Sequence, residues 1–247
     1  MDIPPRTNIA VLDRNGLRGA VIGVLRQAYE RETTDPEIVR VFMAAVEDMR
    51  RAGATIVDPA AVEGLNAIRR PQDAGPCMGF KYDINRYLAA RGDRVPVKDL
   101  AAIIKSGRFH PSVQRRLEMA DKGPENGPES PACLADMEYR EKVRDAVLQS
   151  MDKLKLDAFV YPTWSNPPRL IGDLNSPAGD NSQFFSPTTG FPAINVPMGF
   201  TRGGTLPAGM TIYGRAWSEA ALLKIAYAYE QATHHRRAPS STPPLIN

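Results

Sequence analysis

The sequence predicts an α/β protein, in which a mixed β-sheet is flanked by helices. A short apolar stretch, Ala20–Leu25, has the length and the β-branched content of a strand. An amphipathic stretch at residues 33–54 has the apolar spacing of a helix, and the β-branched segment "ATIVDP" follows it directly. Strand, helix and strand with short links form a βαβ unit, which favours parallel pairing within a mixed or parallel sheet.

The helix of this unit has recognisable start and stop signals. Asp35 is a natural N-cap, Pro36 fits the first turn, and Glu37 suits the positive end of the helix dipole. Gly53 ends the helix. Residues at helical spacing form one apolar stripe that is expected to face the sheet: Ile38, Phe42, Ala45, Val46 and Met49.

Residues 60–130 are expected to be mostly helical pieces. The segment at 78–93 has four apolar residues predicted to lie on one side: Phe80, Ile84, Tyr87 and Leu88. Two further helices are predicted after Pro96 and at Pro111. The run "KGPENGPESPA" then predicts a solvated loop.

The C-terminal part of the chain predicts one long helix, three strands and a final helix. The long helix covers about 132–154, with Val143, Val147, Met151 and Leu154 facing inward. The strands are "DAFVYP", "PAINVP" and "GMTIYG", and the last helix runs from Trp217 to His235 with Leu222, Ile225, Ala226 and Tyr229 buried. Residues 238–247 are expected to form a loose tail, and no repeat or linker divides residues 1–247.

Composition argues against nucleic-acid and membrane partners. The net charge is +3, and the 24% of charged residues are mixed along the chain. The densest basic run, residues 234–237, closes the last predicted helix, where cations complement the dipole. No apolar run reaches the roughly 20 residues that a membrane span needs, and the first residues lack the apolar region of a signal peptide. Cys77 and Cys133 match no metal spacing and suggest a reducing compartment. We expect a cytoplasmic protein without cofactor or metal.

Sequence motifs alone give no catalytic site. The three histidines have no evident acidic or thiol partner, and zinc, P-loop and G-x-S-x-G motifs are absent from the sequence. Ser150 and Lys153 form an S-x-x-K pattern. The pattern falls near the end of the long predicted helix and lacks the S-D-N and K-T-G partners of serine acyl-transfer enzymes. We therefore interpret it as part of a solvated helix face.

The C-terminal third resembles the end of amidase signature family proteins. The resemblance rests on four features in order: Tyr161-Pro162-Thr163 at a strand end, G-x-P-A-x-x-V-P at 190–197, L-P-x-G at 206–209, and a Gly-Arg turn before the Glu-Gln-Ala-Thr helix end. "LRGAVIGVLRQ" and "FKYDINRYLA" are similar to earlier segments of the family, so the resemblance covers residues 12–239. It implies the later half of the family's α/β/α sandwich, and hence a single partial domain over 1–247.

The resemblance also implies a missing catalytic segment. Family members carry a nucleophilic Ser, a second Ser with a cis peptide bond and a Lys in an upstream Gly/Ser-rich region. A serine hydroxyl is a weak nucleophile and needs such a base. This sequence has no comparable run: its one Ser-Ser pair, at 240–241, lies in the proline-rich tail, and Lys105 and Ser106 lack a glycine cradle. We therefore expect no family-type hydrolysis from this chain alone.

In the resembled family, the loop before the G-x-P-A-x-x-V-P strand lines the substrate pocket. Asp180 in this loop corresponds to an acidic residue that contacts a substrate amine in the amidotransferase branch; alternatively, Asp180 or Asn181 caps its own backbone in an Asx-type turn. Phe184 and Phe185 form either a pocket wall or core. Arg115 and Arg116, a pair that can face a substrate carboxylate, also suit a solvated helix face, and Trp164 lines the cleft or simply packs.

Two functional hypotheses follow. The chain is either the substrate-pocket half of a carbon–nitrogen amide hydrolase that needs a separate catalytic half, or a non-catalytic binding module derived from one. The expected partners are a small amide substrate, when the chain is completed, and other copies of the chain, because exposed sheet edges and apolar faces favour self-association.

Overall fold

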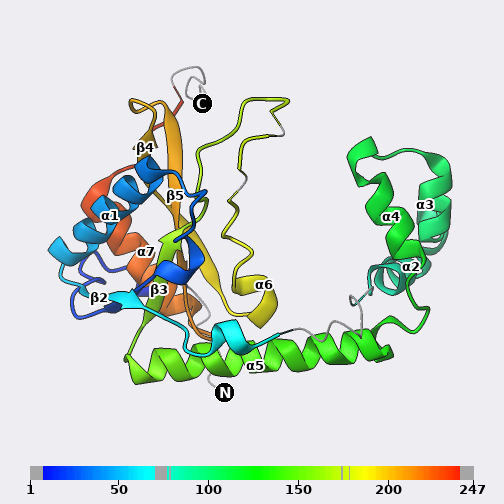
Figure 1. Ribbon diagram of the computed structural model, residues 1–247, viewed down its shortest axis with the longest axis horizontal. Helices are drawn as coiled ribbons and strands as arrows, with labels where there is room; N and C mark the ends of the chain where they lie inside the picture. The colour runs from blue at the N-terminus through cyan, green and yellow to red at the C-terminus, as the bar shows by residue number, and fades with distance from the viewer. Residues whose placement is uncertain (1–7, 70–76, 78, 174, 178, 240–247) are drawn as a thin grey trace. The chain divides into compact units, whose positions relative to one another are not determined.

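The computed structural model describes residues 8–69, 77, 79–173, 175–177 and 179–239 (Figure 1). They form two compact units, one of residues 1–65 with 144–247 and one of residues 66–143. The single partial domain expected from the sequence stays a prediction. Most of the tail, 240–247, lies outside the described residues, and the two tail residues before it are exposed without regular structure.

A five-stranded mixed sheet is the centre of the larger unit, as predicted. Its strands are β1 (Val21–Leu25), β2 (Thr55–Ala60), β3 (Ala158–Pro162), β4 (Ala193–Thr201) and β5 (Leu206–Tyr213). Their order is β2-β1-β3-β5-β4. β1 pairs in parallel with β2 and β3, whereas β5 pairs antiparallel with β3 and β4. The parallel β1–β2 pair confirms the predicted βαβ unit.

Helices α1 (Pro36–Arg51) and α7 (Glu219–Thr233) both pack on β4 (Figure 1). The predicted cap is confirmed, because the carboxylate of Asp35 accepts a hydrogen bond from Glu37 N at 2.8 Å. The predicted apolar faces of both helices are buried. A short helix, α6 (Ser186–Thr189), precedes β4.

The long helix α5 (Pro131–Lys153) contributes residues to both units. Its C-terminal part buries Val147 and Met151, as predicted, while Leu154 just beyond it is half-buried. Arg144 Nε donates a hydrogen bond to the carbonyl of Thr189 at 2.7 Å. This bond ties α5 to the end of α6 within the larger unit.

The smaller unit contains α2 (Phe80–Arg91), α3 (Leu100–Ser106), α4 (Gln114–Asp121) and the start of α5. On the side of α2 that was predicted to be apolar, Leu88 is buried, whereas Phe80 and Tyr87 are 50% and 53% exposed. The main neighbours of α2 are the short helices α3 and α4 and two 3₁₀ turns, Gly92–Arg94 and Gly127–Glu129. Both units also contain short 3₁₀ turns. These are Asn8–Val11, Arg26–Ala28, Leu65–Ala67, Gly92–Arg94, Pro111–Val113 and Gly127–Glu129.

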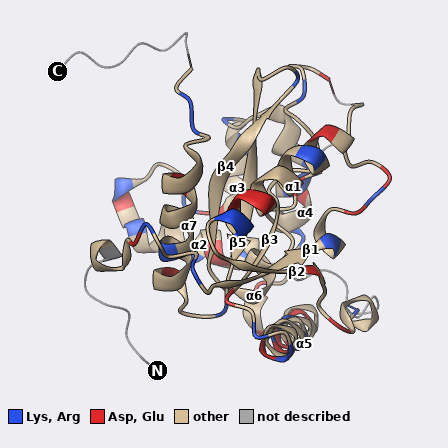
Figure 2. Cartoon of the chain, turned by 90° about the vertical axis from the view of Figure 1, so that its left-hand side faces the viewer, with Lys and Arg blue, Asp and Glu red and all other residues tan. Residues whose placement is uncertain are grey.

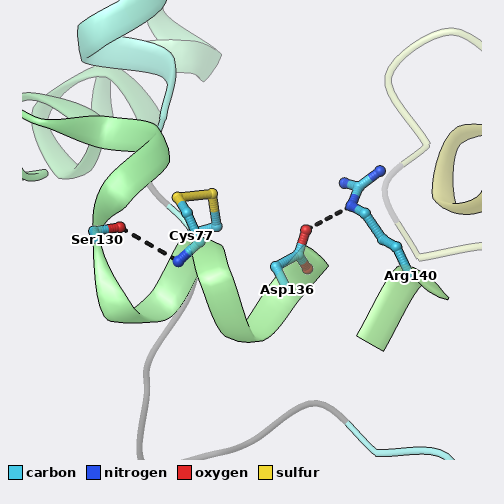
Figure 3. Close-up of a disulfide and its surroundings, with 5 residues drawn as sticks. Cys77, Ser130, Asp136 and Arg140 are labelled. Carbon is cyan, nitrogen blue, oxygen red and sulfur yellow. Dashed lines mark hydrogen bonds and ion pairs between the residues drawn. A yellow bond between two sulfur atoms is a disulfide. The ribbon is translucent and has the colours of Figure 1, made fainter. Parts of the chain in front are cut away.

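A disulfide joins Cys77 to Cys133 in the smaller unit (Figure 3). Cys133 is buried near the start of α5, where its backbone N–H donates to Ser130 Oγ at 3.3 Å. The two cysteines are 56 residues apart, and the sequence alone gave no sign of the pairing. The bond removes the argument for a reducing compartment, because disulfides persist mainly in oxidising ones.

Charged residues of both signs are interspersed over the elements in view in Figure 2. Among the described residues, no helix has the length and apolar character needed to cross a membrane.

Candidate functional site

The larger unit has a pocket of about 760 Å³ beside the ends of β3, β4 and β5. Its walls are mostly apolar, and four of the wall residues are prolines. One wall is the chain segment that follows β3. The lining residues are Ile38, Thr163, Trp164, Asn166, Pro167, Pro168, Arg169, Asn195, Val196, Pro197, Pro207, Ala208 and Gly209.

A small polar network forms one side of this pocket. Asn195 on β4 is paired with Thr211 on β5, so both side chains share one sheet face. Thr211 Oγ1 donates to Asn195 Oδ1 at 2.8 Å, and Thr163 Oγ1 lies 3.0 Å from Thr211 Oγ1. The network is neutral, and the Oδ1 end of the Asn195 amide faces the two threonine hydroxyls.

The segment after β3 is closed at its base by β-type hydrogen bonds. Trp164 and Asp180 form an antiparallel bridge, in which Asn181 N donates to Thr163 O at 2.9 Å and Ser165 N donates to Gly179 O at 2.7 Å. Thr163 N also donates to Gly209 O of β5 at 2.8 Å. The backbone of Thr163–Ser165 is therefore held from both sides.

Asn181 is the fully buried side chain at this base. Its Nδ2 donates to Pro162 O and Ser165 Oγ, both at 2.9 Å. Its Oδ1 accepts from Arg31 Nη2 at 3.0 Å. One amide thus joins the end of β3, the segment base and the turn before α1.

Asp180 forms the Asx-type turn that the sequence offered as an alternative. Its Oδ1 accepts from Ser182 N at 2.9 Å and from Ser182 Oγ at 2.6 Å. Asp180 is not among the pocket lining. Its predicted contact with a substrate amine stays a prediction.

Of the aromatic pair, Phe185 belongs to the core, which was one of the two predicted alternatives. Phe185 is buried and stacks on Tyr213, with ring centroids 5.5 Å apart, whereas Phe184 is half-buried and meets Phe185 edge-on. Neither residue lines the pocket.

Tyr161 lies buried on β3, and its hydroxyl has no hydrogen-bond partner among the described residues. Burial first, and then the nearby Tyr213 and Asp180, raise the pKa of Tyr161, so the phenol stays protonated.

Trp164 lines the pocket and remains 46% exposed. Arg115 and Arg116 lie on α4 in the smaller unit and are both exposed. Their proposed approach to a substrate carboxylate stays a prediction.

The described pocket lining includes no Ser, Cys, Lys, His, Asp or Glu. It can bind a ligand, but it offers no nucleophile with an adjacent base. Ser150 is buried and accepts from Glu63 N, while Lys153 pairs with Glu63, so the S-x-x-K residues have structural partners. This corrects the interpretation of Ser150 as part of a solvated face.

His235 also corrects the sequence analysis, which found no acidic partner for any histidine. Its Nε2 lies 3.0 Å from Asp48 Oδ2. The contact joins the residue just beyond α7 to α1, two segments that are distant in sequence. Among the described residues, no group of His, Cys, Asp and Glu could hold a metal ion.

Comparison with known proteins identifies the family. The model of the Amidase family matches residues 2–223. The chain belongs to the amidase signature family. Its mixed sheet with flanking helices matches solved amidase structures. The peptide amidase from Stenotrophomonas maltophilia superimposes with a TM-score of 0.70 and 29% identity, over 95% of this chain and 48% of that one.

Curated relatives of this amidase family chain include glutamyl-tRNA(Gln) amidotransferase subunits A. The subunit from Myxococcus xanthus is 29% identical over 226 residues, which are 87% of this chain and 46% of that protein. A subunit from Synechococcus is 30% identical over 243 residues, or 93% of this chain and 46% of that protein. The chain therefore spans about half the length of the curated relatives it matches.

Proposed function

We propose that this chain is the substrate-pocket half of an amidase that cleaves a carbon–nitrogen amide bond. The observation that supports the proposal most is the pocket itself. It is built largely from the segments that resemble the family, and its described lining contains hydrogen-bonding and apolar groups without a nucleophile or a base. The serine, its base and the oxyanion donors would come from a second polypeptide segment. A cytoplasmic location, which the family relatives suggest, would require the Cys77–Cys133 disulfide to persist in a reducing compartment, where such bonds are rare.

The requirements of acyl transfer support this division of roles. Acyl transfer to serine requires a hydroxyl, a proton acceptor and preorganised donors to the oxyanion at one place. The described pocket provides one side of such a site, namely a shaped wall for the substrate. A separate half that carries the reacting groups would complete it.

A complementation assay tests the proposal. The chain is mixed with a separately produced half of the Stenotrophomonas peptide amidase, the half that it does not match, and ammonia release is measured from aromatic and aliphatic primary amides. We expect activity from the mixture and none from either part alone. A matched control replaces the nucleophilic serine of the added half and should abolish the activity.

The second hypothesis is a binding module that has kept the pocket without the chemistry. The described lining, which has no nucleophile beside a base, also favours this function. Reading the DNA upstream of Met1 in three frames separates the two hypotheses. A Lys codon followed by a Gly/Ser-rich segment with paired serines supports the amidase half, and their absence supports the module. Turnover of an amide by the purified chain alone, blocked by a serine-directed covalent probe, would contradict both.

A further inference from the structure

We infer that the pocket selects the aromatic part of a neutral amide, with the amide carbonyl accepting a hydrogen bond from Asn195 Nδ2. This inference rests on the proposed function and names the substrate class for the same site. It follows from the apolar rings that line the pocket, from the polar side at Asn195, and from the hydrogen-bonded backbone around Trp164, which we call the frame.

The walls favour a flat apolar group. The volume of about 760 Å³ lies within the usual range for small-molecule sites. Four proline rings line the pocket, those of Pro167, Pro168, Pro197 and Pro207, and Trp164 is about half exposed. Rigid rings lose little conformational entropy when a ligand binds, and aromatic groups interact favourably with an indole face.

The polar side favours a neutral carbonyl. Asn195 Oδ1 is already engaged by Thr211 Oγ1, at 2.8 Å, and Asn195 is exposed in the pocket lining. Among the described residues, Asn195 Nδ2 makes no hydrogen bond, so it remains able to donate. An amide N–H bonds to a carboxylate as well as to a carbonyl, but removing the carboxylate from water costs more free energy than removing a neutral carbonyl. This desolvation cost favours the neutral ligand.

The only charged residue of the described lining is Arg169. It is exposed, and it interacts electrostatically with Asp173, whose pKa is lowered mainly by hydrogen bonds within its own turn. Solvent and Asp173 therefore screen the guanidinium. The neutral amide donors of the lining are then Asn195 Nδ2 and Asn166 Nδ2, which has no hydrogen-bond partner among the described residues. Because no Asp or Glu lines the described pocket, an ammonium group has no partner there either.

The frame is preorganised for this ligand. The Trp164–Asp180 bridge and the buried Asn181 hold the backbone on both sides of Trp164. Thr163 is fixed to Gly209 of β5 by its backbone and to Thr211 by its side chain. Binding therefore requires little ordering of the protein, which preserves affinity for a small ligand.

Tryptophan fluorescence of the full chain tests the inference. The sequence has two tryptophans, Trp164 in the pocket and Trp217 before α7, so each can be observed alone. Phenylacetamide is titrated into the Trp217→Phe variant, in which Trp164 reports, and into the Trp164→Phe variant as the matched control. We expect a saturable change in the first variant and none in the second.

Comparison ligands and one further variant define the class. Acetamide, which lacks the ring, and phenylacetate, which replaces the amide by a carboxylate, should each bind at least about tenfold more weakly than phenylacetamide, and Asn195→Ala should weaken phenylacetamide binding by about tenfold. Calorimetry on the unmodified chain repeats the ligand comparison without any tryptophan substitution.

Equal binding of phenylacetate and phenylacetamide, or an unsaturable response in the Trp164 reporter, would overturn the inference. The outcome is independent of the complementation assay, because binding is measured without the second half. Activity of the mixture on aliphatic amides alone would leave the proposed function standing and remove the aromatic assignment. Aromatic binding without activity in any mixture would support the aromatic assignment and count against the proposed function.

Discussion

Asp180 and Asn181 are adjacent polar residues with different structural roles. Asp180 bonds only to a nearby residue of its own turn, and a short loop sequence can predict that. Asn181 bonds to Pro162, Ser165 and Arg31, which are up to 150 residues away. The role of Asn181 depends on contacts between distant parts of the chain, so the sequence alone did not distinguish it from the local turn formed by Asp180.

Replacing Asn181 by Ala should destabilise the larger unit. The change leaves the carbonyl of the buried Pro162 without its side-chain partner, and an unsatisfied buried group costs about 1–3 kcal/mol. Arg31 is exposed and keeps its hydrogen bond to Ala28 O. Urea unfolding monitored by circular dichroism measures the loss. The exposed Asn175→Ala provides the control and should change stability by less than about 0.5 kcal/mol. A similar loss for both variants would contradict the role assigned to Asn181.

At the scale of elements, the β4–β5 hairpin is fastened to the start of α1. Arg202 in the hairpin turn donates through Nη1 to Glu37 Oε2 at 2.6 Å and through Nη2 to Asp35. Its backbone N–H also donates to both carboxylate oxygens of Glu37 at 3.0 Å. Asp35 therefore caps the helix and pairs with the hairpin at once, although only the cap was visible in the sequence.

This fastening predicts a pH dependence. Burial alone would raise the pKa of Asp35, but hydrogen bonds from Arg202 and Glu37 N together lower it below its ordinary 3.8. The pKa of Glu37 is lowered from 4.5, first by the backbone N–H and then by the side chain of Arg202. Because the folded state has the lower values, the stabilisation is present above about pH 4.5 and is lost as pH falls through the folded pKa values.

Arg202→Met should therefore lower the thermal midpoint at pH 7, and the difference from the unmodified chain should shrink as pH falls below 4. Thermal unfolding across pH 3 to 7 measures it. Arg14→Met, at another exposed arginine, should show no such convergence. A difference that stayed constant with pH would argue against the ion pairs as its cause.

Strand β1 depends on a glycine for its packing. A Cβ built on Gly23 would lie 2.6 Å from Leu156 Cδ1 and 2.9 Å from Ala60 Cβ. Gly23→Ala should therefore lower the free energy of unfolding by about 1–3 kcal/mol. Gly79→Ala is the matched control, because its nearest neighbours are 3.9 Å away. Unfolding curves of the two variants should separate clearly; coincident curves would contradict the close packing.

The edge strands of the sheet differ from what the sequence led us to expect. The sequence argument expected unprotected edges, whereas both edge strands contain a proline, Pro59 in β2 and Pro197 in β4. Proline cannot donate to a further strand, so it blunts such an edge. Self-association of the chain stays a prediction, and the fully exposed Ile171 and the nearly fully exposed Leu170 are now the better candidates for its contacts.

At the scale of the whole molecule, the two units differ in how they are stabilised. The larger one has a sheet core with many fully buried side chains. The smaller one buries few, chiefly Leu88, Leu100, Ala120 and Val143, and it holds the disulfide (Figure 3). Small units with thin cores commonly depend on such a covalent link.

Reduction of the disulfide should destabilise the smaller unit selectively. A link that closes a loop of this length stabilises by roughly 2–4 kcal/mol. Amide hydrogen exchange with and without reductant should show faster exchange in α2, α3 and α4 and unchanged exchange in the sheet, which serves as the internal control. The Cys77→Ser, Cys133→Ser double variant should reproduce the effect in the absence of reductant. Unchanged exchange in the helices would refute the dependence.

Local signals predicted the larger unit well because its elements are strongly periodic. The helix stripe beginning at Ile38 and the short β-branched strands need only their own residues to be recognised. The smaller unit was predicted less well, since its helices are short and partly uncovered, as Phe80 shows. Of the site, Trp164 was named in advance, whereas Asn195 and Thr211 were missed because strand pairing alone brings them together.

The closed base of the segment between β3 and α6 has a consequence for engineering. Hydrogen bonds at Thr163, Ser165 and Asn181 complete the frame before the chain reaches its outer turn. A graft of foreign sequence at the exposed residues 170–172, in the turn closed by the bond from Asp173 N to Leu170 O, would thus leave the anchor points intact. We expect this turn to accept recognition peptides or affinity tags, which would make it a handle for immobilising the protein.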